Sequence, residues 1–474
     1  MISWLAQNAR RRPGGAALLW KGGRQTYGEL ADAVSRRAAV LAEKGVESGS
    51  RVGLQAENSV EWIRLAHAVF WLGGTLVPLD ARLTADEVDR QIAEVEPDLV
   101  LTEDEFDGLV DRAEQRGEGI EPVRVPPSAT ATIFFTSGTT GRPKPVPLSW
   151  ANHLWSAAGS AFNLGVESLD RWLVCLPLCH VGGLAIVLRS AIYGTAVDLM
   201  AKFDARAVVD RLESEPITHA SFVPTMLRRV VEQGGNGSKS LRAVLVGGGP
   251  AGDSLVEAAR EREIPALPTW GMTETASQFT TVPPGSAEES RGSVGPPILD
   301  GELRVADEEG RRRAAGGSGR IQVRGPMVFD GYLGRPELNT EVFADGWFDT
   351  GDVGWIDERG HLVVDARSSE RITTGGETVD PVEVQRALRK HPSVVEACVV
   401  GVEDSEWGER IAAGIEVDRP AGNLESLDQY CRTELAAFKC PKHWEVFEQL
   451  PRTSAHKIDR HRVREHFESA ENEE

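Results

Sequence analysis

A run of glycine and hydroxyl-bearing residues follows an apolar strand pattern and has the composition of an anion-binding loop. The predicted strand is Ile133–Phe135, and the residues after it are Thr136, Ser137, Gly138, Thr139, Thr140 and Gly141, followed by Lys144. Small residues let backbone N–H groups approach an anion closely, and a lysine adds positive charge. Polyphosphate is the natural guest, and an ordinary Gly/Thr-rich turn is the alternative. A P-loop is excluded, because Pro143 precedes the lysine and no Ser or Thr follows it.

The segment Thr136–Lys144 resembles the phosphate-binding signature of the superfamily of adenylate-forming enzymes, which contains acyl-CoA synthetases, adenylation domains of peptide synthetases and luciferases. Further matches to that superfamily follow in the expected order over nearly the whole chain: Trp270–Glu274, Trp347–Asp352, Arg367, Gly375–Glu377, Leu450–Thr453 and Lys457. Several motifs in the right order are far more specific than any one of them.

The resemblance assigns catalytic and nucleotide-binding roles to the second motif. Glu274 would help to hold the Mg²⁺ that neutralises the phosphates of ATP, and Thr273 would donate to a phosphate oxygen. Trp270 stands where the family usually has tyrosine and would offer an aromatic face to adenine, next to Gly271. A capped helix start and a buried core tryptophan are the structural alternatives.

Three other places would contact the adenosine of ATP. Gly248 and Gly249 follow a strand and resemble the segment that lines the adenine pocket, although a tight turn gives the same pattern. Asp352 would bind the ribose hydroxyls, because a carboxylate accepts two hydrogen bonds from a vicinal diol. Arg367 resembles a hinge-side arginine that also reaches the ribose. Without the other motifs, Asp352 would be interpreted as a surface turn residue and Arg367 as an exposed arginine.

The resemblance also implies a mobile C-terminal lysine. Lys457 would bridge the substrate carboxylate and the α-phosphate in the first half-reaction, and Gly376 would line the pantetheine path of coenzyme A. The chain departs from the family's pattern beside both lysines: His456 replaces the glycine that usually precedes Lys457, and Pro145 replaces a common glycine after Lys144. Activity should survive both departures, but His456 could restrict the backbone that carries Lys457.

The stretch from Leu176 to Leu184 is the informative one for the acid substrate. His180 matches the family's gating aromatic beside the acyl pocket, and as a lone residue it would be a loop histidine. Arg189 follows the apolar run Ala185–Leu188. A charge there is costly unless it meets an anion, and the equal alternative is an arginine whose head reaches solvent.

Arg189, the stretch Gly271–Gln278, the stretch Gly292–Gly295 and the short chain together look most like the o-succinylbenzoate-CoA ligases of menaquinone biosynthesis. Their substrate has two carboxylates, of which one is activated and the other requires a cation such as Arg189. Ser277 and Gln278 would hydrogen-bond the keto or carboxylate oxygens. The alternative is that these two residues only shape the turn after Glu274.

The resemblance implies an ATP-dependent ligase that forms an acyl-adenylate, releases pyrophosphate and then transfers the acyl group to coenzyme A, with release of AMP. Another aryl- or medium-chain acyl-CoA ligase is the first alternative. An adenylating enzyme that loads a carrier protein is the second, weakened by the lack of an appended carrier domain. A nucleotide-hydrolysing motor is disfavoured, since it requires a true P-loop.

The elements that must position these residues alternate between strands and helices. Near-continuous apolar strands such as Arg51–Gln55 and Ala243–Val246, separated by amphipathic helices such as Ala205–Glu213, predict an α/β chain with mostly parallel sheets. We expect a large N-terminal domain, 1–366, of two packed sheets with helices and a small β subdomain at about 300–366. A smaller, mobile α+β C-terminal domain is predicted for 367–474, with the hinge placed to within a residue or two.

Composition limits the partners of this 474-residue chain. Its formal net charge of −20 argues against a nucleic-acid surface, because phosphate backbones bind clustered Lys and Arg. No apolar stretch is long and clean enough for a transmembrane helix, and the N-terminus lacks the pattern of a secretion signal. Five irregularly spaced cysteines predict no disulfide framework or zinc site and fit a reduced cytoplasm. A homo-oligomer is compatible with the sequence, which leaves the oligomeric state open.

Overall fold

The computed structural model describes residues 1–83, 85–136, 144–249, 251–286, 290–367, 372–374, 377–379, 381–404, 407–417, 424–435, 437–453 and 456–471. The chain forms two compact units. The first comprises Met1–Leu303 and Val323–Phe348, and the second comprises Arg304–Gln322 and Asp349–Glu474. The predicted α/β class is confirmed. The hinge after residue 366 concerns movement and stays a prediction.

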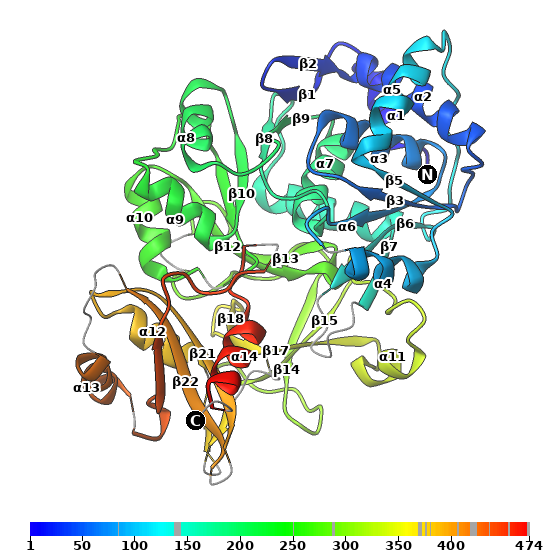
Figure 1. Cartoon of the computed structure of the whole chain (residues 1–474). Coiled ribbons are helices and arrows are strands. Elements are labelled where there is room, and N and C mark those ends of the chain that lie inside the picture. The colour runs from blue at the N-terminus through cyan, green and yellow to red at the C-terminus, as the bar shows by residue number, and fades with distance from the viewer. Residues whose placement is uncertain are drawn as a thin grey trace. The chain divides into compact units, whose positions relative to one another are not determined.

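The first unit contains an eight-stranded sheet with the order β13-β12-β11-β10-β8-β9-β1-β2 (Figure 1). Its strands are β1 (Ala16–Trp20), β2 (Gly23–Thr26), β8 (Arg171–Val174), β9 (Ala196–Leu199), β10 (His219–Phe222), β11 (Ala243–Val246), β12 (Ala266–Met272) and β13 (Ser277–Thr281). The six central strands, β12, β11, β10, β8, β9 and β1, are parallel to one another, whereas β2 and β13 pair antiparallel at the two edges. The predicted strand Ala243–Val246 is therefore confirmed, and all four of its residues are buried, as a covered parallel strand requires.

A second, five-stranded sheet of the same unit has the order β5-β3-β4-β6-β7. Its strands are β3 (Arg51–Gln55), β4 (Thr75–Leu79), β5 (Leu99–Thr102), β6 (Thr130–Thr136) and β7 (Lys144–Ser149). Only the pair β6/β7 is antiparallel. The anion-binding segment predicted from the sequence thus lies between the end of one strand and the start of its neighbour.

Helices join these strands. They are α1 (Trp4–Arg11), α2 (Tyr27–Glu43), α3 (Val60–Trp71), α4 (Ala85–Val95), α5 (Glu103–Gln115), α6 (Trp150–Leu164), α7 (Val181–Tyr193), α8 (Ala205–Ser214), α9 (Pro224–Glu232), α10 (Asp253–Glu261) and α11 (Pro336–Val342). Local sequence explains where several begin. Thr26 opens α2 with a capping box, in which its backbone N–H donates to Glu29 Oε2 at 2.8 Å. The predicted helix Ala205–Glu213 is α8, which Asp204 caps.

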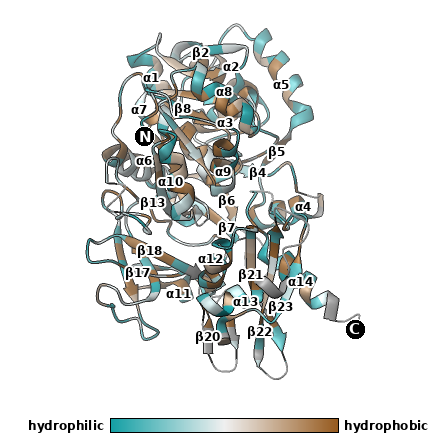
Figure 2. Cartoon of the chain, turned by 90° about the vertical axis from the view of Figure 1, so that its left-hand side faces the viewer, coloured by the Kyte–Doolittle hydropathy of each residue, from teal (hydrophilic) through white to brown (hydrophobic). Residues whose placement is uncertain are grey.

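Helix α5 shows the amphipathic pattern that covers a sheet. Its buried residues Phe106, Leu109 and Ala113 recur with helical spacing, while the rest of the helix is mainly hydrophilic, as the teal colour in Figure 2 shows. Acidic residues fill its first turn, where the helix dipole favours negative charge. Packing of such apolar stripes, rather than helix propensity, supplies most of the stability of these helices.

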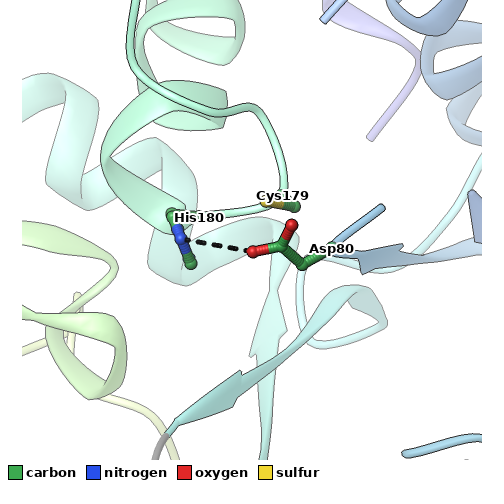
Figure 3. Close-up of side chains that lie close together, drawn as sticks. All are labelled: Asp80, Cys179 and His180. Atoms are coloured by element: carbon green, nitrogen blue, oxygen red, sulfur yellow. Dashed lines mark ion pairs between the residues drawn. The ribbon is translucent and has the colours of Figure 1, made fainter. Parts of the chain in front are cut away.

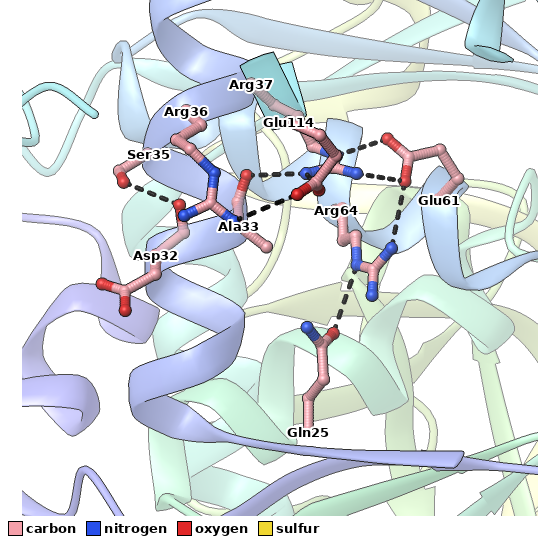
Figure 4. A network of polar contacts seen from close by, with 9 residues as sticks. All are labelled: Gln25, Asp32, Ala33, Ser35, Arg36, Arg37, Glu61, Arg64 and Glu114. Atoms are coloured by element: carbon pink, nitrogen blue, oxygen red, sulfur yellow. Dashed lines mark hydrogen bonds and ion pairs between the residues drawn. The ribbon is translucent and has the colours of Figure 1, made fainter. Parts of the chain in front are cut away.

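A buried arginine ties three helices of the first unit together (Figure 4). Arg37 of α2 is 1% exposed, and its guanidinium donates to both carboxylate oxygens of Glu61 on α3, at 2.5 and 2.8 Å. Its third nitrogen lies 3.5 Å from Glu114 of α5. The bidentate pair with Glu61 fixes the direction as well as the distance between α2 and α3. The longer contact with Glu114 connects α5 to the same guanidinium.

The remaining strands form two smaller sheets. One has the order β14-β15-β17-β16 with β18 on β17, and consists of β14 (Glu302–Ala306), β15 (Gly319–Arg324), β16 (Phe343–Ala344), β17 (Trp347–Ile356) and β18 (Leu362–Arg367). It contains the short strands that the sequence predicts beyond residue 300. The other has the order β20-β19-β22-β21 with β23 on β22, and consists of β19 (Ile372–Thr374), β20 (Glu377–Val379), β21 (Val394–Asp404), β22 (Gly408–Val417) and β23 (His443–Val446).

Strand β21 separates two apolar clusters of the second unit. Ala397 and Val399 lie in one cluster, whereas Cys398 and Val400 lie in the other, as the two-residue period of a strand requires. The helical elements here are α12 (Pro381–Arg389), α13 (Leu424–Glu434), the 3₁₀ turn η3 (Ala437–Lys439) and α14 (Arg460–Glu471). Helix α14 contributes Val463 to the second cluster.

All five cysteines are free, and all except Cys179 are buried. No helix in the described ranges is long and apolar enough to span a bilayer.

Candidate active site

The two ends of the predicted phosphate loop are fixed by a strand pair. Thr136 is the last residue of β6 and Lys144 is the first of β7, and the two are cross-strand partners. The predicted residues Ser137, Gly138, Thr139, Thr140 and Gly141 lie outside the described residues. The ammonium nitrogen of Lys144 lies 5.3 Å from the centre of the Tyr332 ring, a cation–π contact.

Tyr332 brings the predicted metal ligand to the same place. Its hydroxyl donates to Glu274 Oε1 at 2.8 Å, and the backbone N–H of Phe329 donates to the Glu274 carbonyl at 2.9 Å. Glu274 is 4% exposed. A buried carboxylate has the oxygen ligands that Mg²⁺ prefers, and Tyr332 contacts both this carboxylate and Lys144. Sequence reasoning missed Tyr332, and its only signal was an aromatic residue with a polar tip, which requires a partner when buried.

Glu274 lies on a short 3₁₀ turn, η1 (Thr273–Thr275), between β12 and β13. The turn ends with two residues in the left-handed region, Ala276 at φ 52° and Ser277 at φ 95°. A Cβ on Gly271 would come within 1.9 Å of the Ser277 carbonyl oxygen, so only glycine fits there. The close approach of these two strands therefore depends on a glycine inside the predicted motif.

The predicted adenine contacts come from adjacent parallel strands. Trp270 of β12 is 9% exposed and packs edge-on against Phe279 at 6.0 Å between ring centres. Gly248 and Gly249 are exposed just beyond β11, and Gly248 has φ 76°. Because β11 and β12 are parallel neighbours, their carboxyl ends meet at one edge of the sheet.

Arg189 of α7 is 3% exposed, so the alternative of a solvent-facing head is wrong. One guanidinium nitrogen donates to Ser156 Oγ at 3.1 Å, and the group lies 5.9 Å from the Trp172 ring centre. Its Nε is buried without a hydrogen-bond partner among the described residues, and within them no carboxylate forms an ion pair with it. Burial lowers the pKa of Arg189 below its usual range.

Among the described residues, the groups shown in contact with Arg189, Ser156 and Trp172, carry no negative charge. His153 is fully buried, and burial together with the charge of Arg189 lowers its pKa to about 3, so the imidazole is neutral. Its Nε2 lies 2.9 Å from the Thr132 hydroxyl. Burial of a cation among neutral groups is costly unless an anion meets it, and the contact of Arg189 with an anionic substrate group stays a prediction.

Ser277 and Gln278 follow the Glu274 turn as predicted, but their environments differ. Ser277 is partly exposed, whereas Gln278 is 3% exposed and its amide nitrogen donates to Thr281 Oγ1 at 2.5 Å. The Gln278 Oε1 atom is buried without a partner in the described structure. The contacts of these residues with substrate stay predictions.

His180 lies at the start of α7, in a group of side chains that the sequence did not reveal (Figure 3). Arg82 donates to both oxygens of Asp80 at 2.8 and 2.7 Å, and it lies 3.5 Å from His180 Nε2. The same Nε2 also lies 4.0 Å from Asp80 Oδ2, the contact drawn as a dashed line in Figure 3. Burial opposes ionisation of Asp80, but the bonds from Arg82 outweigh it and lower the pKa of that carboxyl.

The same group could be read as a metal site. Asp80, Cys179 and His180 each offer a ligand atom, and these atoms lie within 4.8 Å of one another. However, the Arg82 guanidinium already takes both Asp80 oxygens, and burial, with the Asp80 charge second, raises the pKa of Cys179 to about 12. With both Asp80 oxygens bonded to Arg82, the group forms a hydrogen-bonded network in this structure.

In the second unit, Asp352 and Arg367 are cross-strand partners on β17 and β18. Asp352 is 7% exposed, and its backbone N–H donates to Thr350 Oγ1 at 3.1 Å. The structure thus brings together the two residues predicted for the ribose. Gly376 lies outside the described residues.

Lys457 is exposed on a tight turn of the same unit. The Thr453 N–H donates to the Lys457 carbonyl at 2.7 Å, and the His456 N–H donates to the Thr453 carbonyl at 2.9 Å. His456 has φ 59°, a left-handed conformation that favours glycine. The residue that we expected to restrict the backbone before Lys457, His456, thus has an unusual backbone conformation itself.

Comparison with family models matches both parts of the chain. The model of the AMP-binding enzyme matches residues 5–333, and the model of the AMP-binding enzyme C-terminal domain matches residues 383–457. These ranges contain the predicted site residues from Thr136 to Arg189 and from Gly248 to Gln278, and, in the second range, Lys457.

Known relatives cover the whole chain. A 2-succinylbenzoate–CoA ligase of Listeria innocua is 37% identical over 476 residues, which cover 98% of this chain and 99% of the relative. The o-succinylbenzoate CoA synthetase of Bacillus subtilis, solved with its acyl-adenylate intermediate, has a TM-score of 0.91 at 35% identity and covers 98% of both chains. The same enzyme with ATP and magnesium has a TM-score of 0.89 at 35% identity, covering 98% of this chain and 99% of that one.

Proposed function

The chain belongs to the family of AMP-binding enzymes, and from that premise we propose that it converts o-succinylbenzoate into o-succinylbenzoyl-CoA with the use of ATP, in menaquinone biosynthesis. The observation that carries the choice of acid is Arg189, a cation buried among neutral groups. An acid with a second carboxylate would neutralise it, whereas a simple fatty or aromatic acid would leave it unpaired.

In the first half-reaction the substrate carboxylate attacks the α-phosphorus of ATP, the bond to the β-phosphate breaks, and pyrophosphate leaves. The chain's residues bind and orient these groups. Thr136, Lys144 and the loop between them would hold the phosphates, and Thr273 would donate to one of their oxygens. Lys457 would stabilise the charge that develops between the carboxylate and the α-phosphate.

Glu274 would hold Mg²⁺, since it presents a buried carboxylate beside Lys144 and Tyr332. When bound, this ion would neutralise the phosphate charge. The nucleoside would contact Trp270, Gly271, Gly248 and Gly249 at the base, and Asp352 and Arg367 at the ribose. These assignments rest on the motifs.

In the second half-reaction the thiolate of coenzyme A attacks the acyl carbonyl, and AMP leaves with the bonding electrons of the anhydride. Gly376 would line the path of the pantetheine arm. His180 would lie beside the acyl group, and Ser277 and Gln278 would contact the keto or carboxylate oxygens of that group. Because ATP and coenzyme A are supplied in the cytoplasm, we place the reaction there.

Pyrophosphate release with Mg-ATP tests the proposal, with o-succinylbenzoate, benzoate and octanoate as acids, each with and without coenzyme A. The thioester is identified by mass. Selective turnover of o-succinylbenzoate is expected. Turnover of octanoate instead would support the proposed reaction class but refute o-succinylbenzoate as the substrate. If no acid gave pyrophosphate, the assignment as an enzyme would be overturned.

A further inference from the structure

Ser156 connects the buried cation to the turn that carries the predicted metal ligand. It lies on α6, is 2% exposed, and accepts a hydrogen bond from Arg189 Nη2 at 3.1 Å. Its own hydroxyl donates to the carbonyl of Ala276 at 2.7 Å. One side chain thus makes a continuous chain of two hydrogen bonds from Arg189 to the residue that ends η1.

The turn at the end of this chain has an unusual backbone. Ala276 and Ser277 both have positive φ, at 52° and 95°, although neither is glycine. Such conformations persist only where the surroundings hold them. Within the turn, Thr275 Oγ1 contacts the Met272 and Ser277 carbonyls at 3.0 Å, and Ser156 anchors the turn to a helix.

The hydroxyl is placed to link the orientation of Arg189 to the turn. A cation that donates to Ser156 polarises its O–H and strengthens the bond that this hydroxyl donates to Ala276. When a carboxylate pairs with Arg189, it fixes the guanidinium in the orientation that donates to Ser156. The bond from Ser156 to the turn is then held more firmly when the anion subsite is occupied.

We propose that Ser156 is a positioning residue that couples binding of the acid's second carboxylate at Arg189 to binding of Mg-ATP at the Thr273–Glu274 turn. The proposal rests on the function proposed above and adds a specificity device to it. A dianionic acid would tighten the nucleotide site, whereas an acid without the second carboxylate would not. Specificity would then be expressed in nucleotide affinity as well as in affinity for the acid.

The test measures the dissociation constant of the complex between the protein and Mg²⁺-bound α,β-methylene-ATP, a nucleotide that binds without reacting. It is measured in the absence and in the presence of saturating o-succinylbenzoate. In the unsubstituted protein we expect the acid to tighten the nucleotide about fivefold or more, the lower end of typical coupling between sites. In Ser156→Ala the coupling should fall to below about twofold. Benzoate, which lacks the second carboxylate, should give little tightening in either protein.

Ser160→Ala is the matched control, because Ser160 lies one turn further along α6, is 1% exposed, and in the described structure bonds neither Arg189 nor Ala276. It should retain the coupling. Thermal unfolding shows whether both variants fold. Equal coupling in Ser156→Ala and the unsubstituted protein, or binding of the acid with no tightening at all, would overturn the proposal. Failure of the unsubstituted protein to bind or activate o-succinylbenzoate would instead overturn the proposed function and this inference with it.

Discussion

Burial of the Arg189 guanidinium has a cost in free energy that the described residues do not offset with a negative charge. The group is held by a serine hydroxyl and an aromatic ring, and its pKa is lowered by burial. Arg171, in contrast, is buried against Asp198 and Glu215. Two buried arginines of one unit thus differ in whether their counter-charge belongs to the chain.

Arg189→Met should raise the free energy of unfolding of the ligand-free protein by about 1 kcal/mol or more, because an apolar side chain replaces a poorly compensated buried charge. Arg171→Met should lower it by about 2 kcal/mol or more, since Asp198 loses a partner. The stabilisation given by o-succinylbenzoate should disappear only in Arg189→Met. Urea unfolding with and without the acid measures all three effects, and a strong loss of stability in ligand-free Arg189→Met would contradict this account of its charge.

His456 has a side chain at a position whose backbone conformation favours glycine. Its φ of 59° costs about 1 kcal/mol for a residue with a Cβ, and the turn that contains it presents Lys457. His456→Gly should therefore raise the single-turnover rate of adenylate formation, by up to about fivefold. His456→Ala is the control and should give no gain. Equal rates in the two variants would show that this backbone conformation does not limit the positioning of Lys457.

At the scale of elements, the site depends on how closely β12 and β13 approach. Gly271 faces the Ser277 carbonyl oxygen, and an added Cβ would also lie 2.9 Å from the Phe279 nitrogen. Both obstacles are backbone atoms, so they cannot move aside as a flexible side chain would. The turn that carries Glu274 is the part of the strand pair that would have to shift.

Gly271→Ala should lower the free energy of unfolding by about 1–3 kcal/mol and abolish most adenylate formation. Gly108→Ala is the contrasting change, since Gly108 lies within α5 and an added Cβ there meets nothing within 4 Å. It should stabilise the protein by about 0.5–1 kcal/mol and leave activity unchanged. Denaturant unfolding and pyrophosphate release check both, and full activity in Gly271→Ala would disprove the steric argument.

The strands that frame the site could be predicted from the sequence because they are buried on both faces. Arg51–Gln55 and Ala243–Val246 appear with the predicted bounds as β3 and β11. The side-chain networks could not be predicted. Tyr332 meets Glu274, and Arg82 meets His180, across 58 and 98 positions of the chain. Periodicity reports which face of an element is buried, but it carries no information on which distant polar group completes a contact.

At the scale of the whole molecule, ordered motifs predicted the reaction class, while burial within the fold supplied the evidence for the acid. His67 and His153, two of the three buried histidines whose pKa burial lowers, add a property that no motif indicated. Burial lowers the pKa of His67 to about 4 and, with the charge of Arg189 as a smaller cause, that of His153 to about 3. In the unfolded chain both would titrate near the ordinary value of about 6.5.

Between pH 6.5 and about 4 the unfolded chain therefore binds more protons at these positions than the folded one. Stability is retained above this window and falls as the pH drops through it, by about 1.4 kcal/mol per pH unit for each histidine. His67→Leu should remove about one histidine's share of the slope, whatever its effect on stability at pH 7. Urea unfolding from pH 5 to 6.5 measures it, and an unchanged slope in the variant would refute the assignment.

We propose that this chain selects a dianionic acid and joins it to coenzyme A. The most direct test offers the purified protein equal concentrations of o-succinylbenzoate, benzoate and octanoate with limiting Mg-ATP and coenzyme A, and quantifies the three thioesters by mass spectrometry. We expect o-succinylbenzoyl-CoA as the dominant product, with its share lost in Arg189→Met. Dominance of octanoyl-CoA or benzoyl-CoA in the unsubstituted protein would contradict the account.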